Sequence, residues 1–110
     1  MTLSRSEYLA LDATAMADAV LAGDVSPAEL HSAATEQHHA THEQIHAVVE
    51  WYEEPSWGIV GSRSDDVRAG RLDGVPFLRK DYGSAEAGRL VERGSRLAAG
   101  VIAPTTDPFY

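Results

Sequence analysis

The strongest constraint on the fold is a helix start signal in the stretch Ser-Pro-Ala-Glu-Leu, which begins at Ser26. Ser26 can accept a hydrogen bond as the N-cap, Pro27 suits the first helical turn, and Glu29 completes a capping box. These features predict a helix from Pro27 to about Gln37 or His38. Its buried face is expected to carry three apolar residues: Leu30, Ala33 and Ala34.

A second helix is predicted just before this one, over Ala13–Leu21. Asp12 is placed to act as its N-cap, and Gly23 stands where a left-handed C-terminal cap is expected. Apolar residues recur along the segment at helical spacing, so one face is expected to be buried. The first part of the chain therefore reads as two short helices joined by a tight turn.

The residues that follow change from helical to strand spacing. In Ile45–Tyr52 the side chains alternate with a period of two, and β-branched and aromatic residues dominate, which predicts a strand. A second, short strand is predicted at Val75–Lys80, after a turn at Asp73-Gly74. A helix at Trp57–Ala69 and a helical turn near Arg96–Ala99 complete the predicted elements, and no internal repeat or linker is evident.

Composition limits the functions open to the chain. Its 110 residues suit one small domain, and 44% hydrophobic with 24% charged residues is typical of a globular protein. A net charge of −8 disfavours nucleic-acid and anionic-membrane partners. The absence of cysteine excludes disulfides and thiolate chemistry. No signal-peptide core and no apolar run of about 18 residues is present, so a cytoplasmic protein is expected.

The single lysine is the most informative basic residue. The sequence has 9 basic residues, and all except Lys80 are arginine. Burial can lower the pKa of a lysine far enough for it to act as a base, whereas a guanidinium stays charged. The alternative explanation is that one lysine occurs by chance in an arginine-rich chain. The sequence around Lys80 distinguishes this explanation from a role as a base.

That surrounding sequence, Asp-Gly-Val-Pro-Phe-Leu-Arg-Lys-Asp over residues 73–81, resembles the first motif of the amidase signature family. The likeness extends in order from about Tyr8 to Tyr110. It includes the opening helices, the segment His-Glu-Gln-Ile-His-Ala-Val-Val-Glu, a glycine-rich loop ending in Gly94-Ser95, and Thr-Thr-Asp-Pro-Phe-Tyr. The sequence departs from the family pattern at Val91-Glu92-Arg93, where paired threonines are common, and in the bridge after Glu53.

The resemblance implies an incomplete α/β fold, the N-terminal portion of an amidase-signature domain with helices packed on a mixed β-sheet. Residues 1–110 would be part of a single amidase domain, truncated before the Gly/Ser-rich serine motif. Without the rest of such a domain, its strands would leave unpaired edges. Marginal stability or self-association, for example as a homodimer, is then expected for the isolated chain.

The resemblance also implies a function. Enzymes of this family act on linear amides through a Ser–cis-Ser–Lys triad, and Lys80 stands at the position of the catalytic lysine. Neither catalytic serine has a counterpart here, so the chain alone is expected to be inactive. The implied partners are a small-molecule amide and the remainder of the amidase chain. No cofactor and no metal is implied.

The segment His42-Glu43-Gln44-Ile45-His46 matches the HExxH pattern of zinc peptidases. That pattern needs both histidines on one helical face, with the glutamate activating a bound water. The predicted strand at Ile45–Tyr52 would separate His42 from His46, and no third ligand is obvious, so we interpret the match as coincidence. A small zinc hydrolase using His42, Glu43 and His46, and a non-catalytic interaction module, stay open as alternatives.

Residues near Lys80 also have simpler, structural roles to consider. Asp81 could tune the lysine or serve as a structural hydrogen-bond acceptor. Ser95, next to a glycine, is expected to bond backbone in a turn. Phe77 and Tyr82 are expected in the core or in a pocket wall.

Overall fold

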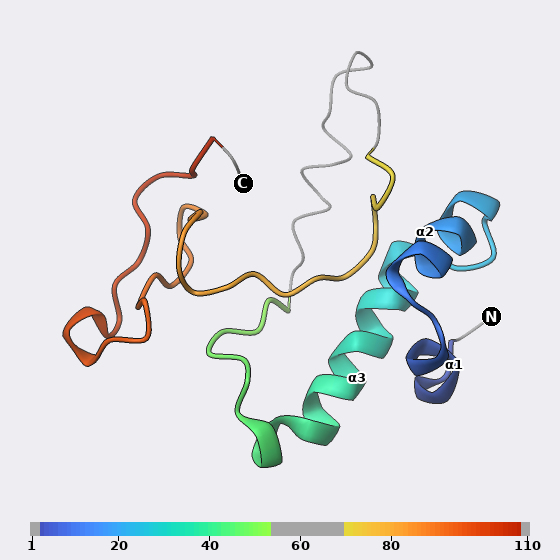
Figure 1. Ribbon diagram of the computed structural model, residues 1–110, viewed down its shortest axis with the longest axis horizontal. Coiled ribbons are helices and arrows are strands. Elements are labelled where there is room, and N and C mark those ends of the chain that lie inside the picture. The colour runs from blue at the N-terminus through green and yellow to red at the C-terminus, as the bar shows by residue number, and fades with distance from the viewer. Residues whose placement is uncertain (1–2, 54–69, 109–110) are drawn as a thin grey trace. The chain divides into compact units, whose positions relative to one another are not determined.

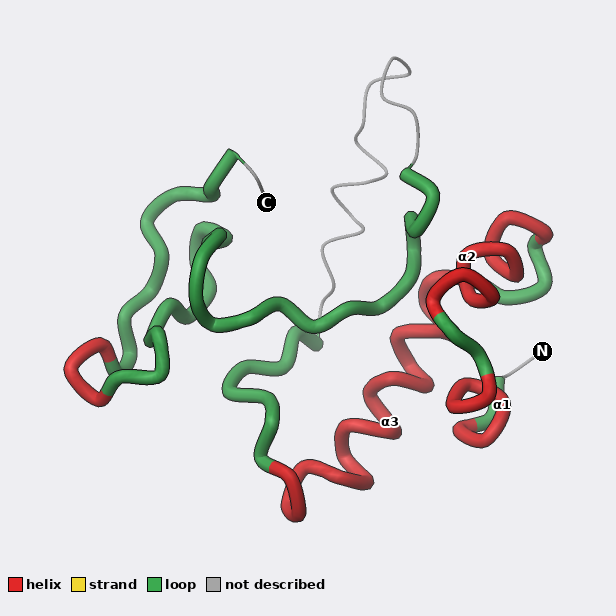
Figure 2. The backbone as a smooth tube through the Cα atoms, viewed as in Figure 1, coloured by secondary structure: helices red, strands yellow, loops and turns green. Residues whose placement is uncertain are grey.

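The computed structural model describes residues 3–53 and 70–108. Within them lie three α-helices and one 3₁₀ helix: α1 (Arg5–Ala10), α2 (Ala13–Ala22), α3 (Pro27–Ile45) and η1 (Arg96–Ala98). The chain divides into two compact units, Met1–Phe77 and Leu78–Tyr110. Figure 1 shows the three α-helices in the first unit, and Figure 2 shows that the described part of the second consists almost entirely of loops.

The starts of α2 and α3 confirm the sequence prediction. The Asp12 carboxylate accepts a hydrogen bond from the Ala15 N–H at 2.8 Å, and Gly23 ends α2 in the left-handed region with φ of 80°. At α3 the Ser26 hydroxyl accepts from the Glu29 N–H at 3.2 Å, while the Glu29 carboxylate accepts from the Ser26 N–H at 2.9 Å. All three expected caps are therefore present.

The first helix, α1, was not among the predicted elements. It has a capping box of its own, in which Ser4 and Glu7 bond each other's backbone N–H groups. The helix packs against α3, and the Arg5 guanidinium donates to the Gln37 side-chain oxygen at 2.6 Å. Its short length hides it in the sequence, because six residues give too little periodicity to detect.

The core of the first unit forms around α2 and α3. Leu30 is fully buried, and Met16 and Val25 pack with it. Ala33 and Ala34 are also buried, so the predicted inner face of α3 is confirmed. The partly buried residues that pack against this cluster come from most of the unit: Leu3, Tyr8, Leu11, Ala19, Val20 and Val75. The core thus joins the helices to a segment far along the chain.

The segment that carries Val75 is held close to the start of α3 at Gly74. Gly74 has φ of 83°, and a Cβ built on it would lie 2.7 Å from Cγ of Pro27 and 3.6 Å from a Val20 methyl. Glycine is required here because any other side chain would overlap the start of α3. The turn at Gly74 delivers Val75 to the core next to it.

The strand predicted at Ile45–Tyr52 is wrong. Ile45 is the last residue of α3, and His46 caps the helix in the left-handed region with φ of 48° while its N–H donates to the His42 carbonyl at 2.8 Å. Residues 47–53 form no ladder. A period of two does not make a strand without a neighbour to pair with, because β-propensity reflects packing on adjacent strands.

The predicted strand at Val75–Lys80 is extended chain without ladder bonds, so this prediction is also wrong for the described structure. Throughout residues 3–53 and 70–108, pairing is limited to an isolated antiparallel bridge, Leu90 with Ile102. The predicted helix at Trp57–Ala69 lies outside the described residues. The mixed sheet of an α/β domain stays a prediction. None of the described helices is both long and apolar enough to cross a bilayer.

The second unit is a pair of loop segments held by backbone hydrogen bonds. Val91 N–H donates to the Val101 carbonyl at 2.8 Å, and Ala103 N–H donates to the Arg89 carbonyl at 2.9 Å. Ala103, in one of these segments, is buried. The helical turn predicted near Arg96–Ala99 is confirmed as η1, Arg96–Ala98.

Removing the Ser26 side chain tests whether this N-cap stabilises α3. We expect Ser26→Ala to destabilise the helical unit by about 1 kcal/mol, because the side-chain acceptor for the first helical turn is lost. Urea unfolding followed by circular dichroism at 222 nm measures the change. Ser32→Ala, an exposed substitution within α3, is the matched control and should leave the midpoint unchanged or slightly raised. Equal losses in both variants would contradict the capping argument.

The cap also has a pH dependence. The Ser26 backbone N–H and hydroxyl donate to the Glu29 carboxylate and lower its pKa from the ordinary value. A carboxylate whose pKa is lower in the folded state than in the unfolded state stabilises the fold at pH values above its unfolded-state pKa. This stabilisation is lost as the pH falls through the folded-state pKa. The stability difference between wild type and Ser26→Ala should therefore narrow in acid.

Candidate functional site

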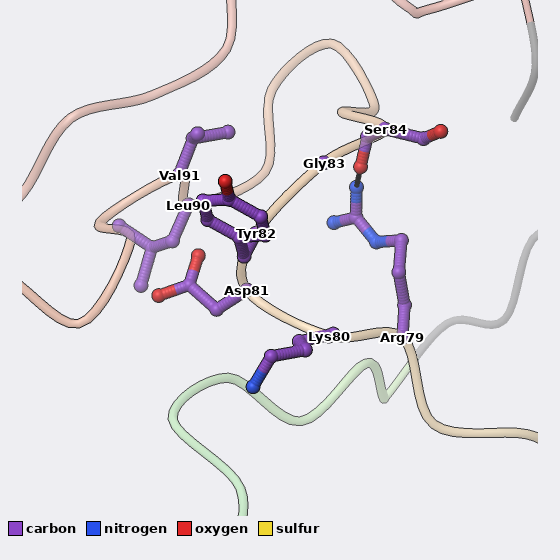
Figure 3. A pocket seen from close by; sticks show the side chains of 8 residues that line it. All are labelled: Arg79, Lys80, Asp81, Tyr82, Gly83, Ser84, Leu90 and Val91. Carbon is purple, nitrogen blue, oxygen red and sulfur yellow. Dashed lines mark hydrogen bonds between the residues drawn. The ribbon is translucent and has the colours of Figure 1, made fainter.

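Lys80 lies near the start of the second unit, in an extended segment. Its side chain is exposed, and within the described chain no hydrogen bond or ion pair holds its amine. Figure 3 shows Arg79 turned toward Ser84, with Lys80 pointing away from that pair. The Lys80 amine is therefore available to a partner that the described residues do not supply.

The residue next to Lys80 has a structural role. Asp81 accepts a hydrogen bond from the Glu92 N–H at 3.1 Å through Oδ1. This bond joins the lysine segment to the glycine-rich loop eleven residues along. Of the two roles considered for Asp81, the structural acceptor is the one observed.

Two further bonds shape the loop. The Arg79 guanidinium donates to the Ser84 carbonyl at 2.6 Å, which closes the turn after Lys80. The Glu92 carboxylate accepts from the Gly100 N–H at 2.6 Å. Glu92, which departs from the family pattern, therefore bonds backbone within its own loop. The expected turn role of Ser95 is confirmed, because its hydroxyl accepts from the Leu97 N–H at 3.2 Å.

A small cavity lies beside the lysine (Figure 3). Eight residues line it: Arg79, Lys80, Asp81, Tyr82, Gly83, Ser84, Leu90 and Val91. Its volume is about 10 Å³, which is room for about one water, whereas small-molecule sites measure about 300–1,000 Å³. The second unit by itself therefore has no room for an amide substrate at this place.

Two aromatic residues near Lys80 were expected in the core or in a pocket wall. Phe77 is 77% exposed and Tyr82 is 71% exposed, so neither belongs to the core. Tyr82 does line the small cavity, as expected of a pocket wall. No hydrogen bond joins Lys80 to a serine hydroxyl in the described part of the chain.

The HExxH residues lie at the end of α3. His42 belongs to α3, whereas His46 follows its last residue, Ile45, as the left-handed C-cap, and the two rings nevertheless lie 5.1 Å apart. Glu43 is exposed. No group of three or more potential metal ligands occurs among the described residues. The two histidine rings of the pattern are therefore close together, but the described residues supply no third ligand.

The sequence reasoning missed a ring cluster on α3. His38 stacks on Trp51 with centroids 4.3 Å apart and planes 2° from parallel, and His31 also stacks on Trp51, with centroids 5.9 Å apart. The His31 ring nitrogen also lies 3.0 Å from the Tyr52 carbonyl oxygen. The available signal was the spacing of seven and four residues between His31, His38 and His42, which places them on one helical face.

Comparison with known protein families, curated proteins and solved structures gives no match for this chain.

Proposed function

We propose that this chain supplies the lysine-bearing, N-terminal segment of an enzyme that hydrolyses linear carboxamides by a Ser–cis-Ser–Lys mechanism. The observation that carries the proposal is the Gly-Val-Pro-x-x-x-Lys-Asp motif, in which Lys80 is the only lysine of the chain. A weak hydroxyl nucleophile needs an aligned base, and a neutral lysine can provide one. The two serines, and most of the substrate pocket, would come from the remainder of the enzyme.

The geometry around Lys80 supports a site in which this chain supplies the lysine and the remainder of the enzyme supplies the serines. Asp81 is occupied by the Glu92 backbone, and Arg79 by the Ser84 carbonyl, so both neighbours of the lysine have structural partners. The Lys80 amine is exposed and has no partner within the described residues. Covering polypeptide could bury the amine and bring a serine hydroxyl within reach, which is what a proton-accepting lysine requires.

The test is a chimera in which this chain replaces the N-terminal segment of an enzyme of the amidase signature family. We expect the chimera to release ammonia from a linear carboxamide, and Lys80→Arg to abolish turnover, because a guanidinium cannot accept the proton. Arg79→Lys is the matched control, since it alters the neighbouring cation and keeps a donor for Ser84. The 110-residue chain alone should show no turnover.

Three results would count against the proposal. They are Lys80-dependent turnover by the isolated chain, a chimera whose activity survives Lys80→Arg, and a folded chimera that is inactive. Circular dichroism of each variant establishes that it is folded before activity is compared.

The zinc hydrolase alternative has one observation in its favour, the distance of 5.1 Å between the ring centroids of His42 and His46. In that proposal both rings bind zinc and Glu43 acts as the base. Hydrolysis that requires added zinc and disappears in Glu43→Gln would favour it over the amidase proposal. No observation on the structure favours an interaction module in particular.

A further inference from the structure

The end of α3 carries three histidine rings in succession. His38 and His42 have ring centroids 4.8 Å apart, and His42 and His46 follow at 5.1 Å. Trp51 lies flat on His38, with planes 2° from parallel. We refer to His38, His42, His46 and Trp51 as the histidine cluster.

The spacing of the first pair fits one metal ion. Imidazole nitrogens bind Zn²⁺ at about 2.0–2.1 Å, so two rings held at a tetrahedral angle have centroids about 5 Å apart. The ring centroids of His38 and His42, on consecutive turns of α3, have this spacing at 4.8 Å. His46 is less suited, because it leaves the helix in the left-handed region. Residues at i and i+4 on a helix are a known arrangement for metal binding.

The His38 ring is also in a suitable chemical state. Partial burial, followed by the neighbouring His42 and His39, lowers the pKa of His38, while Glu53 opposes this shift. A lowered pKa keeps the ring neutral, which is the form that binds metal. Nδ1 of His42 is shielded from solvent and has no hydrogen-bond partner. Stacking on Trp51 leaves the in-plane nitrogen lone pairs of His38 open, because coordination occurs at the ring edge.

We propose that His38 and His42 chelate one divalent transition-metal ion, with water completing its coordination. Neutral imidazoles favour Cu²⁺, Ni²⁺ and Zn²⁺ over Mg²⁺ or Ca²⁺. Two protein ligands make a reversible site rather than a permanent one, and the bound ion ties two consecutive turns of α3 together. The site is independent of Lys80 and of amide hydrolysis.

Trp51 is a built-in reporter of this site. In the full chain carrying Trp57→Phe, Trp51 is the remaining tryptophan of two, and Cu²⁺ bound beside it should quench its fluorescence. We expect a saturable titration at pH 7.5 with one ion per chain. His42→Gln should raise the apparent Kd at least tenfold, and the exposed neighbour His39→Gln, the matched control, should change it less than twofold.

Three further measurements separate this site from other modes of binding. Wild-type quenching should be lost at pH 5, where imidazoles are protonated and most carboxylates are still charged. Zn²⁺ should raise the thermal midpoint of α3 at 222 nm in wild type and not in His42→Ala, which keeps a good helix former. His46→Gln should leave the apparent Kd unchanged, in contrast to the zinc hydrolase alternative, in which His46 is a zinc ligand.

The proposal is overturned if His42→Gln binds Cu²⁺ within twofold of wild type, if His39→Gln weakens binding as much, or if quenching persists unchanged at pH 5. It is equally overturned if His46→Gln, and not His38→Gln, abolishes binding, because the ion would then belong to the other pair. Isothermal titration calorimetry provides the affinity where His38→Gln alters the tryptophan baseline.

Discussion

Replacing Leu30 by alanine is expected to unfold most of the helical unit. Leu30 has no solvent exposure and packs with Met16 and Val25, so truncation removes its buried methyl groups and leaves a cavity. Substitutions of this kind cost about 2–5 kcal/mol. A small unit held by one core is stable by only about 3–5 kcal/mol, so the loss is comparable to the whole stability.

The measurement is urea unfolding followed at 222 nm, with the midpoint compared between variants. Leu21→Ala is the matched control, because Leu21 belongs to the neighbouring helix α2 and is 89% exposed. That change should fall within about 0.5 kcal/mol of wild type. A folded Leu30→Ala variant with a midpoint equal to that of Leu21→Ala would show that this core does not hold the unit together.

The second large effect is expected at Gly74. A Cβ at this position would lie 2.7 Å from Pro27 and the backbone has φ of 83°, so Gly74→Ala meets both steric overlap and left-handed strain. Strain alone costs about 1–2 kcal/mol. Because the overlap adds to it, we expect a total loss of about 2 kcal/mol or more, with Val75 displaced from the core.

Two other glycines separate these two causes. Gly23 has φ of 80° with nothing within 4 Å of a built Cβ, so Gly23→Ala should show the strain alone. Gly70 has neither restriction, so Gly70→Ala should be close to neutral. The expected order of destabilisation is Gly74→Ala, then Gly23→Ala, then Gly70→Ala. An equal effect at Gly74 and Gly23 would rule out the close approach to Pro27.

The features that the sequence predicted correctly are local ones. The caps at Asp12, Gly23 and Ser26 involve residues within a few positions of each other, so each can be inferred from a short stretch. The end of α3 was misplaced because Ile45–Tyr52 has strand-like spacing. That spacing produces a strand only with a neighbouring strand, and Ile45 and Val49 are both exposed.

At the candidate site too, contacts between nearby residues were predictable from the sequence and contacts between distant residues were not. The turn role of Ser95 was predictable from its neighbours, whereas the bond from Glu92 to Asp81 joins residues eleven positions apart and depends on how the loop folds. The stacking of Trp51 on His38 was missed for a similar reason, since the chain must turn back after α3 to bring them together. The catalytic role of Lys80 stays a prediction of the resemblance.

The contact of Gly74 with Pro27 has a consequence for how the first unit folds. The helices can form early from local signals, but their core is closed by Val75, which lies far along the chain. Contacts between sequence-distant residues raise the contact order and slow folding, because the chain loses conformational entropy on closing the loop before the contact can stabilise it. Folding kinetics should therefore be limited by docking of the Gly74–Val75 segment, and Val75→Ala should slow folding more than it speeds unfolding.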